Sequence, residues 1–112
     1  MSALSITNSN GTVTISRDLV ADVVAETAAH CYGVVGLLSA SRVGRILRRD
    51  GVTIGGDASG LKIELHVVVE YGLNLAEVAA SVRSQVAYEV ERVTGLPVAL
   101  VEVVIQDVKQ TA

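Results

Sequence analysis

The sequence predicts an α+β fold: a two-layer domain in which a small mixed or antiparallel β-sheet carries two main helices on one face. Half of the 112 residues are hydrophobic, which suits one compact domain. Aromatic residues make up only 3%, with no Phe and no Trp, so aliphatic side chains must form the core. Stretches with alternating apolar residues flank two stretches of helical period, in the order strand, helix, basic segment, strand, strand, helix, strand.

The first half of the chain contains one predicted strand and one predicted helix. Apolar and polar residues alternate from Thr12 to Ser16, as in a short, half-buried strand. Ser16 is a suitable N-cap, and Asp18 in the first turn complements the helix dipole. The helix is expected to end at Gly33. Its predicted buried stripe consists of Val20, Val23, Val24, Thr27, Ala28 and Cys31.

A short strand with Val52 and Ile54 and a glycine-containing turn precede the longest strand signal, over Leu61 to Tyr71. One face of that strand is apolar and is predicted to point inward, and the other is largely polar. The predicted inward residues are Leu61, Ile63, Leu65, Val67, Val69 and Tyr71. The predicted outward residues are Lys62, Glu64, His66, Val68 and Glu70.

The last part of the chain contains a second helix and a final strand. Asn74 is the expected N-cap, with Glu77 three positions later, and Thr94-Gly95 ends the helix. The predicted stripe is Leu75, Val78, Ala79, Val82, Val86, Val90 and Val93. The final strand opens at Pro97, with Val101, Val103 and Ile105 inward. Val98 and Leu100 are out of phase with this set, which indicates a bulge.

The domain boundaries follow from this order. We expect a flexible N-terminus over residues 1–10, a single domain over 11–108 and a C-terminal tail over 109–112. Residues 36–50 form an Arg-rich amphipathic segment within the domain. No stretch has the composition of a signal peptide or of a membrane span, and a single cysteine suits a reducing compartment. These features predict a cytoplasmic protein.

The strongest local charge feature is a group of four arginines with no acid among them. These residues are Arg42, Arg45, Arg48 and Arg49. They carry +4, so the rest of the chain carries −7 of the net charge of −3. Such a segment can bind phosphate, a lipid headgroup or an acidic partner, or it can pack its apolar residues and leave the arginines in water.

Nucleic-acid binding is a weaker interpretation of the same region. Gly33-Val-Val-Gly36 has the G-x-x-G spacing of a KH-like nucleic-acid-binding loop, and the four arginines would supply the charge. The two central valines are apolar, and almost no aromatic residue is available to stack on bases. Nucleic acid is therefore an unlikely partner, and the KH-like module stays an alternative.

Few residues are available for catalysis. His66 could form a metal or acid-base site with Glu64 and Glu70, but a solvated strand face explains these three residues more simply. His30 and Cys31 point about 100° apart on a helix and cannot act as a dyad. We expect Cys31 in the core and His30 paired with Glu26 on the surface. The chain is therefore expected to have no enzymatic activity, no cofactor, no metal and no small-molecule substrate.

Apolar residues on the predicted outer face of the sheet suggest a contact surface. Val68 and Val104, and also Leu100, interrupt a face that would otherwise be polar. Either a partner or second copy covers them, or segment 36–50 folds over them within one chain. Tyr88, on the predicted exposed face of the second helix, is a further candidate contact residue.

Three segments resemble the alkaline-shock-protein and general-stress family of bacterial envelope stress response proteins. They are Gly11-Thr-Val-Thr-Ile-Ser16 with the helix ending Gly33-Val-Val-Gly-Leu37; Val67-Val-Val-Glu-Tyr-Gly72; and Thr94-Gly-Leu-Pro-Val98 with Val101-Glu-Val-Val-Ile-Gln-Asp107. The resemblance implies a small cytoplasmic protein without a known catalytic role, linked to cell-envelope homeostasis. It also implies self-association or docking to a membrane-anchored protein, which would place the chain at the inner face of the membrane. The family has no established active-site residues to transfer.

Overall fold

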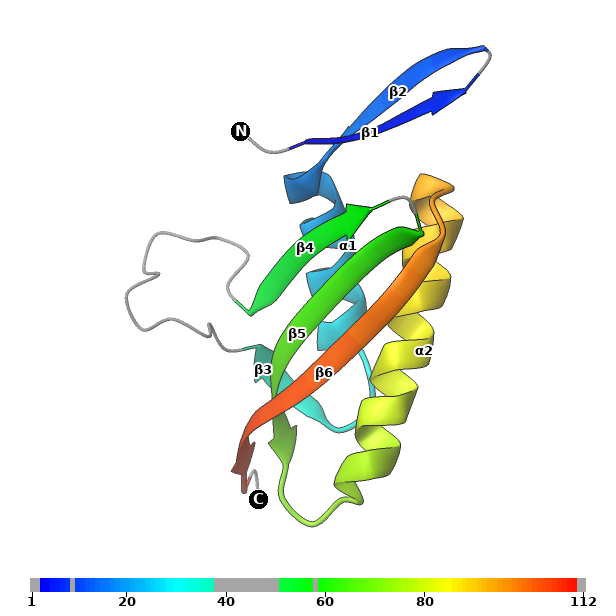
Figure 1. Cartoon of the computed structure of the whole chain (residues 1–112). Helices are drawn as coiled ribbons and strands as arrows, with labels where there is room; N and C mark the ends of the chain where they lie inside the picture. The colour runs from blue at the N-terminus through cyan, green and yellow to red at the C-terminus, as the bar shows by residue number, and fades with distance from the viewer. Residues whose placement is uncertain (1–2, 9, 38–50, 58, 111–112) are drawn as a thin grey trace.

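The computed structural model describes residues 3–8, 10–37, 51–57 and 59–110. Two helices pack on one face of a four-stranded sheet, and a separate two-stranded hairpin projects from one end of the molecule (Figure 1). The predicted two-layer α+β architecture is confirmed.

Strand β5 (Gly60–Glu70) is the centre of the sheet. The antiparallel strands β4 (Val52–Asp57) and β3 (Val34–Leu37) pair with its first and second halves along one edge. Strand β6 (Val98–Lys109) runs parallel to β5 along the other edge (Figure 1). The sheet is therefore mixed, and every strand in it pairs with β5.

The core lies between the inner face of β5 and helices α1 (Arg17–Ala29) and α2 (Leu75–Thr94). Five alternate residues of β5 are buried there, as predicted, and they pack on buried valines from both helices. The five are Leu61, Ile63, Leu65, Val67 and Val69. The prediction for Tyr71 is wrong: its side chain is exposed, because β5 ends at Glu70 and the chain turns at Gly72, whose φ is 99°.

The predicted N-caps of both helices and the end of α2 at Thr94-Gly95 are confirmed. The predicted end of the first helix at Gly33 is wrong: α1 ends at Ala29 with His30 as its C-cap, and Gly33, with a φ of 89°, lies in the turn before β3. The Ser16 hydroxyl accepts a hydrogen bond from the Asp18 N–H at 3.0 Å. The Asn74 side chain accepts one from the Glu77 N–H at 3.1 Å. Val78, Val82, Val86 and Val90 of the predicted α2 stripe are buried.

Two residues of the predicted α2 stripe, Leu75 and Val93, are exposed. Leu75 is the first residue of α2 and Val93 is the last but one. Both lie on the same side of the helix as the buried valines. Their exposure therefore reflects their position along the helix, beyond its most closely packed part.

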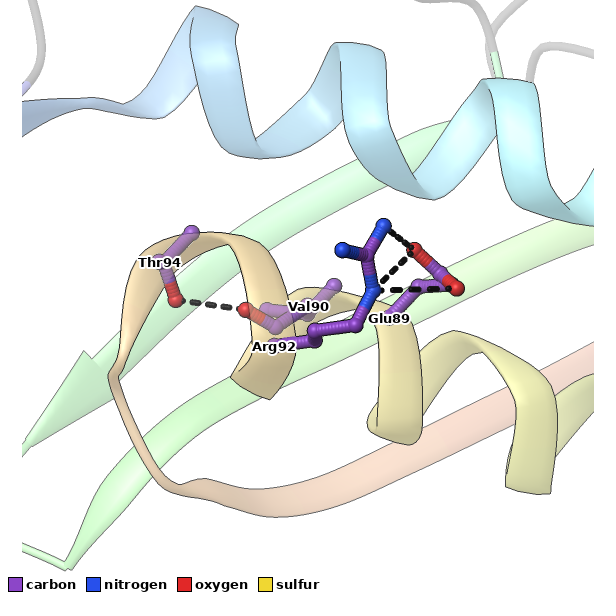
Figure 2. Close-up of polar contacts among 4 residues, drawn as sticks. All are labelled: Glu89, Val90, Arg92 and Thr94. Carbon is purple, nitrogen blue, oxygen red and sulfur yellow. Dashed lines mark hydrogen bonds and ion pairs between the residues drawn. The ribbon is translucent and has the colours of Figure 1, made fainter.

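The connection from α2 to β6 sets where β6 begins beside β5. Gly95 ends α2 with a φ of 76°. Before it, the Thr94 hydroxyl donates to the Val90 carbonyl at 2.7 Å and accepts from the Leu96 N–H at 3.1 Å. Figure 2 shows the Thr94 bond beside the ion pair of Glu89 and Arg92, whose oxygen and nitrogen lie 2.8 Å apart. These bonds hold the last turn of α2 and the chain that follows it.

Gly60 lets the two parallel strands approach at this point. The Leu61 N–H donates to the Pro97 carbonyl at 2.9 Å. A Cβ atom on Gly60, whose φ is 130°, would lie only 2.7 Å from that carbonyl oxygen. The predicted bulge in β6 is present here, between the pairs at Leu61 and Lys62.

Two strands were not predicted. Ala3–Asn8 form β1, which pairs with β2 (Gly11–Ser16), where the sequence suggests only a flexible N-terminus. The flexibility of residues 1–10 stays a prediction. Val34–Leu37 form β3, whose last two residues belong to the predicted Arg-rich amphipathic segment over residues 36–50. The remainder of the Arg-rich segment, from residue 38 to residue 50, lies outside the described residues.

Candidate interaction surface

The outer face of the sheet, opposite the helices, holds a histidine between two acceptors. His66 of β5 is only 8% exposed. Its Nδ1 lies 2.9 Å from Gln106 Oε1 on β6, and its Nε2 lies 2.6 Å from Glu64 Oε2. Because both ring nitrogens face acceptor oxygens, the site suits an imidazolium that donates two hydrogen bonds.

The surroundings of His66 raise its pKa above the ordinary value. The hydrogen bond with Gln106 makes the largest contribution, the hydrogen bond and charge of Glu64 and the charge of Glu102 add to it, and burial opposes it. The strand register places Glu64 directly beside Glu102. A protonated His66 therefore offsets two neighbouring carboxylates that would otherwise repel each other.

Only part of the metal or acid-base site suggested by the sequence is present in the structure. His66 contacts Glu64, while Glu70 lies at the far end of β5, in register with Lys109. In the described part of the chain, no three His, Cys, Asp or Glu side chains are grouped to hold a metal. The cluster balances charge on the outer face.

The predicted apolar contact residues on this face differ in exposure. Val68 is 7% exposed, so it offers almost no surface to a partner. Val104 is half-buried, and Leu100, in register with Lys62, is 52% exposed. The apolar surface that remains is defined here as the outer β6 surface, formed by Leu100 and Val104. A contact role for Val68 and Val104 stays a prediction, and the burial of Val68 weakens it for that residue.

Other predicted site residues are placed as follows. Tyr88 on α2 is 66% exposed, in agreement with its predicted position. The tyrosines Tyr32 and Tyr71 are exposed as well, which the sequence analysis did not predict. All four arginines of the basic group fall within residues 38–50, outside the described residues, so their role stays a prediction.

Cys31 and His30 occupy the positions expected for structural residues. Cys31 is buried, its thiol donates to the Thr27 carbonyl at 3.4 Å, and burial raises the pKa of the thiol. A thiol with a raised pKa is a poor nucleophile at neutral pH. His30 is exposed, with its Nδ1 3.8 Å from a Glu26 carboxylate oxygen.

Two polar contacts between distant parts of the sequence were missed by sequence reasoning. Gln106 contacts His66, although nothing in the local sequence pattern connects them. Arg17 Nη1 donates to the Ile54 carbonyl at 2.7 Å and ties the start of α1 to β4. Both contacts join residues about 40 positions apart, so no short-range signal could reveal them.

Comparisons with solved structures identify similar folds. A MamM variant has a TM-score of 0.56 at 12% identity, covering 85% of each chain. A variant of the MamM C-terminal domain has a TM-score of 0.58 at 12% identity, covering 86% of this chain and 84% of that one. At this identity the likeness shows the fold alone. No helix in the described ranges is long and apolar enough to cross a membrane.

Comparisons of sequence identify the family. The uncharacterized protein YloU of Bacillus subtilis is 32% identical over 109 residues, covering 90% of this chain and 91% of the relative. The uncharacterized protein Spy1614 of Streptococcus pyogenes is 29% identical over 112 residues, covering 93% of each. A family model, described as having a cell envelope-related function, matches residues 5–110. The chain therefore belongs to the alkaline shock protein 23 family, whose function is related to the cell envelope.

Proposed function

We propose that the protein is a non-catalytic component of cell-envelope homeostasis that works by binding other protein chains. It does so by self-association or by docking to a membrane-anchored protein, from the cytoplasmic side of the membrane. The observation that carries the proposal is the outer β6 surface, where Leu100 is 52% exposed and half-buried Val104 lies further along the same face, beyond Glu102. No described helix packs on that face.

The charges around the outer β6 surface favour its burial against a partner. Covering a sheet face that carries unpaired carboxylates would be costly, because each charge would lose its hydration. Here His66 already binds Glu64 and lies within reach of the charge of Glu102. A partner could therefore cover Leu100 and gain apolar burial at about 25 cal/mol per Å² while Glu64 keeps its bond to His66.

The non-catalytic part of the proposal is supported by the positions of the titratable side chains. Cys31 is buried, His30 is paired with Glu26 on an exposed helix face, and His66 bridges two neighbouring side chains. None of these arrangements, within the described residues, joins a nucleophile to a base. The KH-like alternative depends on arginines outside the described residues, and binding of single-stranded nucleic acid at low salt would test it.

The outer β6 surface is tested by a matched pair of leucine substitutions. Leu100→Glu places a charge on that surface, and Leu19→Glu places the same charge on α1, where Leu19 is 49% exposed. We expect light scattering after size-exclusion chromatography to give a lower mass for Leu100→Glu than for wild type and Leu19→Glu.

The result for wild type separates the two forms of the proposal. If wild type is a monomer at every concentration and salt, self-association is wrong. Docking then predicts that Leu100→Glu, and not Leu19→Glu, leaves the membrane fraction of fractionated cells. If both variants behave as wild type in both measurements, the outer β6 surface has no binding role.

A further inference from the structure

The β1–β2 hairpin makes little contact with the other described elements of the chain. Among the described elements, β1 packs extensively only on β2, and β2 makes a small contact with the start of α1. Figure 1 shows the hairpin projecting from the end of the molecule, whose longest extent is 54 Å. A two-stranded hairpin alone is only marginally stable in water, because it buries too little surface. A further contact would therefore stabilise the hairpin.

The edges of the hairpin have none of the features that usually prevent strand pairing. Residues 3–16 contain no charged residue and no proline. The free edge of β6 is different, since that strand carries Glu102, Asp107 and Lys109 and has two register shifts. Charges and bulges on edge strands prevent pairing with other chains, and edges without them favour it. The hairpin edge is thus more open to another strand than the free edge of β6.

The register shows which backbone groups are free at the outer edge of β1. Asn8 pairs with Gly11 across a two-residue turn, so residues 4, 6 and 8 exchange backbone hydrogen bonds with β2. Ser5 pairs with Thr14, and their hydroxyl oxygens lie 3.4 Å apart, as expected for a closely spaced pair without backbone bonds. The N–H and C=O of Ser5 therefore point away from β2.

We propose that β1 of a second copy of this chain pairs antiparallel with this outer edge, centred on Ser5. The two hairpins then form one four-stranded sheet, related by a two-fold axis. The inference rests on the self-association form of the proposed function and adds the outer edge of β1 to the outer β6 surface as a second contact. This pairing places Ser5 opposite Ser5 of the second copy, and residue 3 of each copy opposite residue 7 of the other. About six backbone hydrogen bonds form between the two copies.

A second copy fits this edge because β1 is complementary to itself. Antiparallel pairing about Ser5 places Leu4 opposite Ile6 and Ala3 opposite Thr7 of the second copy. The two largest apolar residues thus meet, and no like charges are brought together. An uncharged strand also has no charge with which to select an acidic or basic partner. β2 is the less suitable edge, because it continues directly into α1 at Arg17.

Two proline substitutions in the same cross-strand pair test the edge in the full chain. Ser5→Pro removes an outward N–H of β1, and Thr14→Pro removes the matching outward N–H of β2; neither removes a bond within the hairpin. We expect Ser5→Pro to raise the dimer dissociation constant on the order of ten- to a hundredfold, because two central bonds are lost. Thr14→Pro should leave it within about threefold.

A cysteine pair gives an independent readout. Ser5→Cys should form a disulfide-linked dimer on mild oxidation, because the two positions face each other across the two-fold axis. Thr12→Cys, exposed on β2, should not. The proposal is overturned if Ser5→Cys gives no linked dimer, or if wild type is a monomer at all concentrations. It is also overturned if Ser5→Pro leaves the dissociation constant unchanged. Loss of dimer in Leu100→Glu but not in Ser5→Pro would leave the proposed function standing and remove β1 as its surface.

Discussion

The inner face of strand β5 is buried along its whole length, whereas the outer face is buried only at His66 and Val68, and by different means. On the inner face, five aliphatic residues in alternate positions pack on helix valines. On the outer face, His66 and Val68 are 8% and 7% exposed, although both described helices lie on the other side. There, His66 is enclosed by hydrogen bonds to neighbouring side chains. Burial of the inner face thus depends on apolar area alone. Burial of the outer face also depends on the hydrogen bonds of His66, whose strength depends on whether its ring is protonated.

The largest effect is expected on the inner face. Leu65→Ala removes a fully buried side chain and should lower the free energy of unfolding by about 3 kcal/mol, since the lost contacts leave a cavity. Lys62→Ala, on the exposed outer side of the same strand, should change it by less than about 0.5 kcal/mol. Urea denaturation of both variants measures the difference. Equal losses of unfolding free energy in the two variants would mean that both faces of β5 contribute equally to stability.

A pair of adjacent valines sharpens the comparison. Val69→Thr on the inner face should cost about 2 kcal/mol, because a hydroxyl is placed in an apolar core. Val68→Thr on the outer face should cost about 1 kcal/mol, since Val68 is also buried but has polar neighbours. Thermal unfolding followed by circular dichroism compares them. A neutral Val68→Thr would show that water reaches this position in solution.

The smallest effect is a dependence on pH. The pKa of folded His66 is raised above its unfolded value of about 6.5, so its protonation stabilises the fold fully below that value. The stabilisation is lost as the pH rises through the folded pKa. His66→Gln should therefore be less stable than wild type by about 1 kcal/mol at pH 5, and the difference should shrink as the pH increases.

The control for the pH dependence is Glu64→Gln. It removes a charge that raises the pKa of His66, so the loss of stability should move to lower pH. Denaturation at a series of pH values locates the transition in each variant. A wild-type advantage over His66→Gln that grows with pH would contradict the raised pKa.

Much of the fold could be predicted because it depends on local pattern. The period-2 alternation of β5 predicts its five inward residues, and the side chains of Ser16 and Asn74 predict both helix starts. The alternation of Leu4 and Ile6 with Ser5 and Thr7 is the same kind of signal. Over so few residues at a polar terminus, however, the same alternation also fits a flexible end.

The candidate site was less predictable because it depends on register. The second register shift in β6, near Val67 and Val68, leaves Gln106 without a partner on β5 in the pairing, and its side chain reaches His66. Shifting a strand by one residue relative to its neighbour would turn its inward-facing side chains outward. The sequence of one strand does not reveal how that strand is aligned with the next. The burial of Val68 likewise depends on which parts of the chain cover the outer face.

The position of β5 as the common partner of β3, β4 and β6 has a consequence for hydrogen exchange. No two other strands of this sheet pair with each other, so none of its backbone ladders survives if β5 is released. The amides of β5 should then exchange with solvent deuterium only when the whole domain unfolds. The amides that join β1 to β2 do not depend on β5, and in the isolated chain they should exchange many times faster.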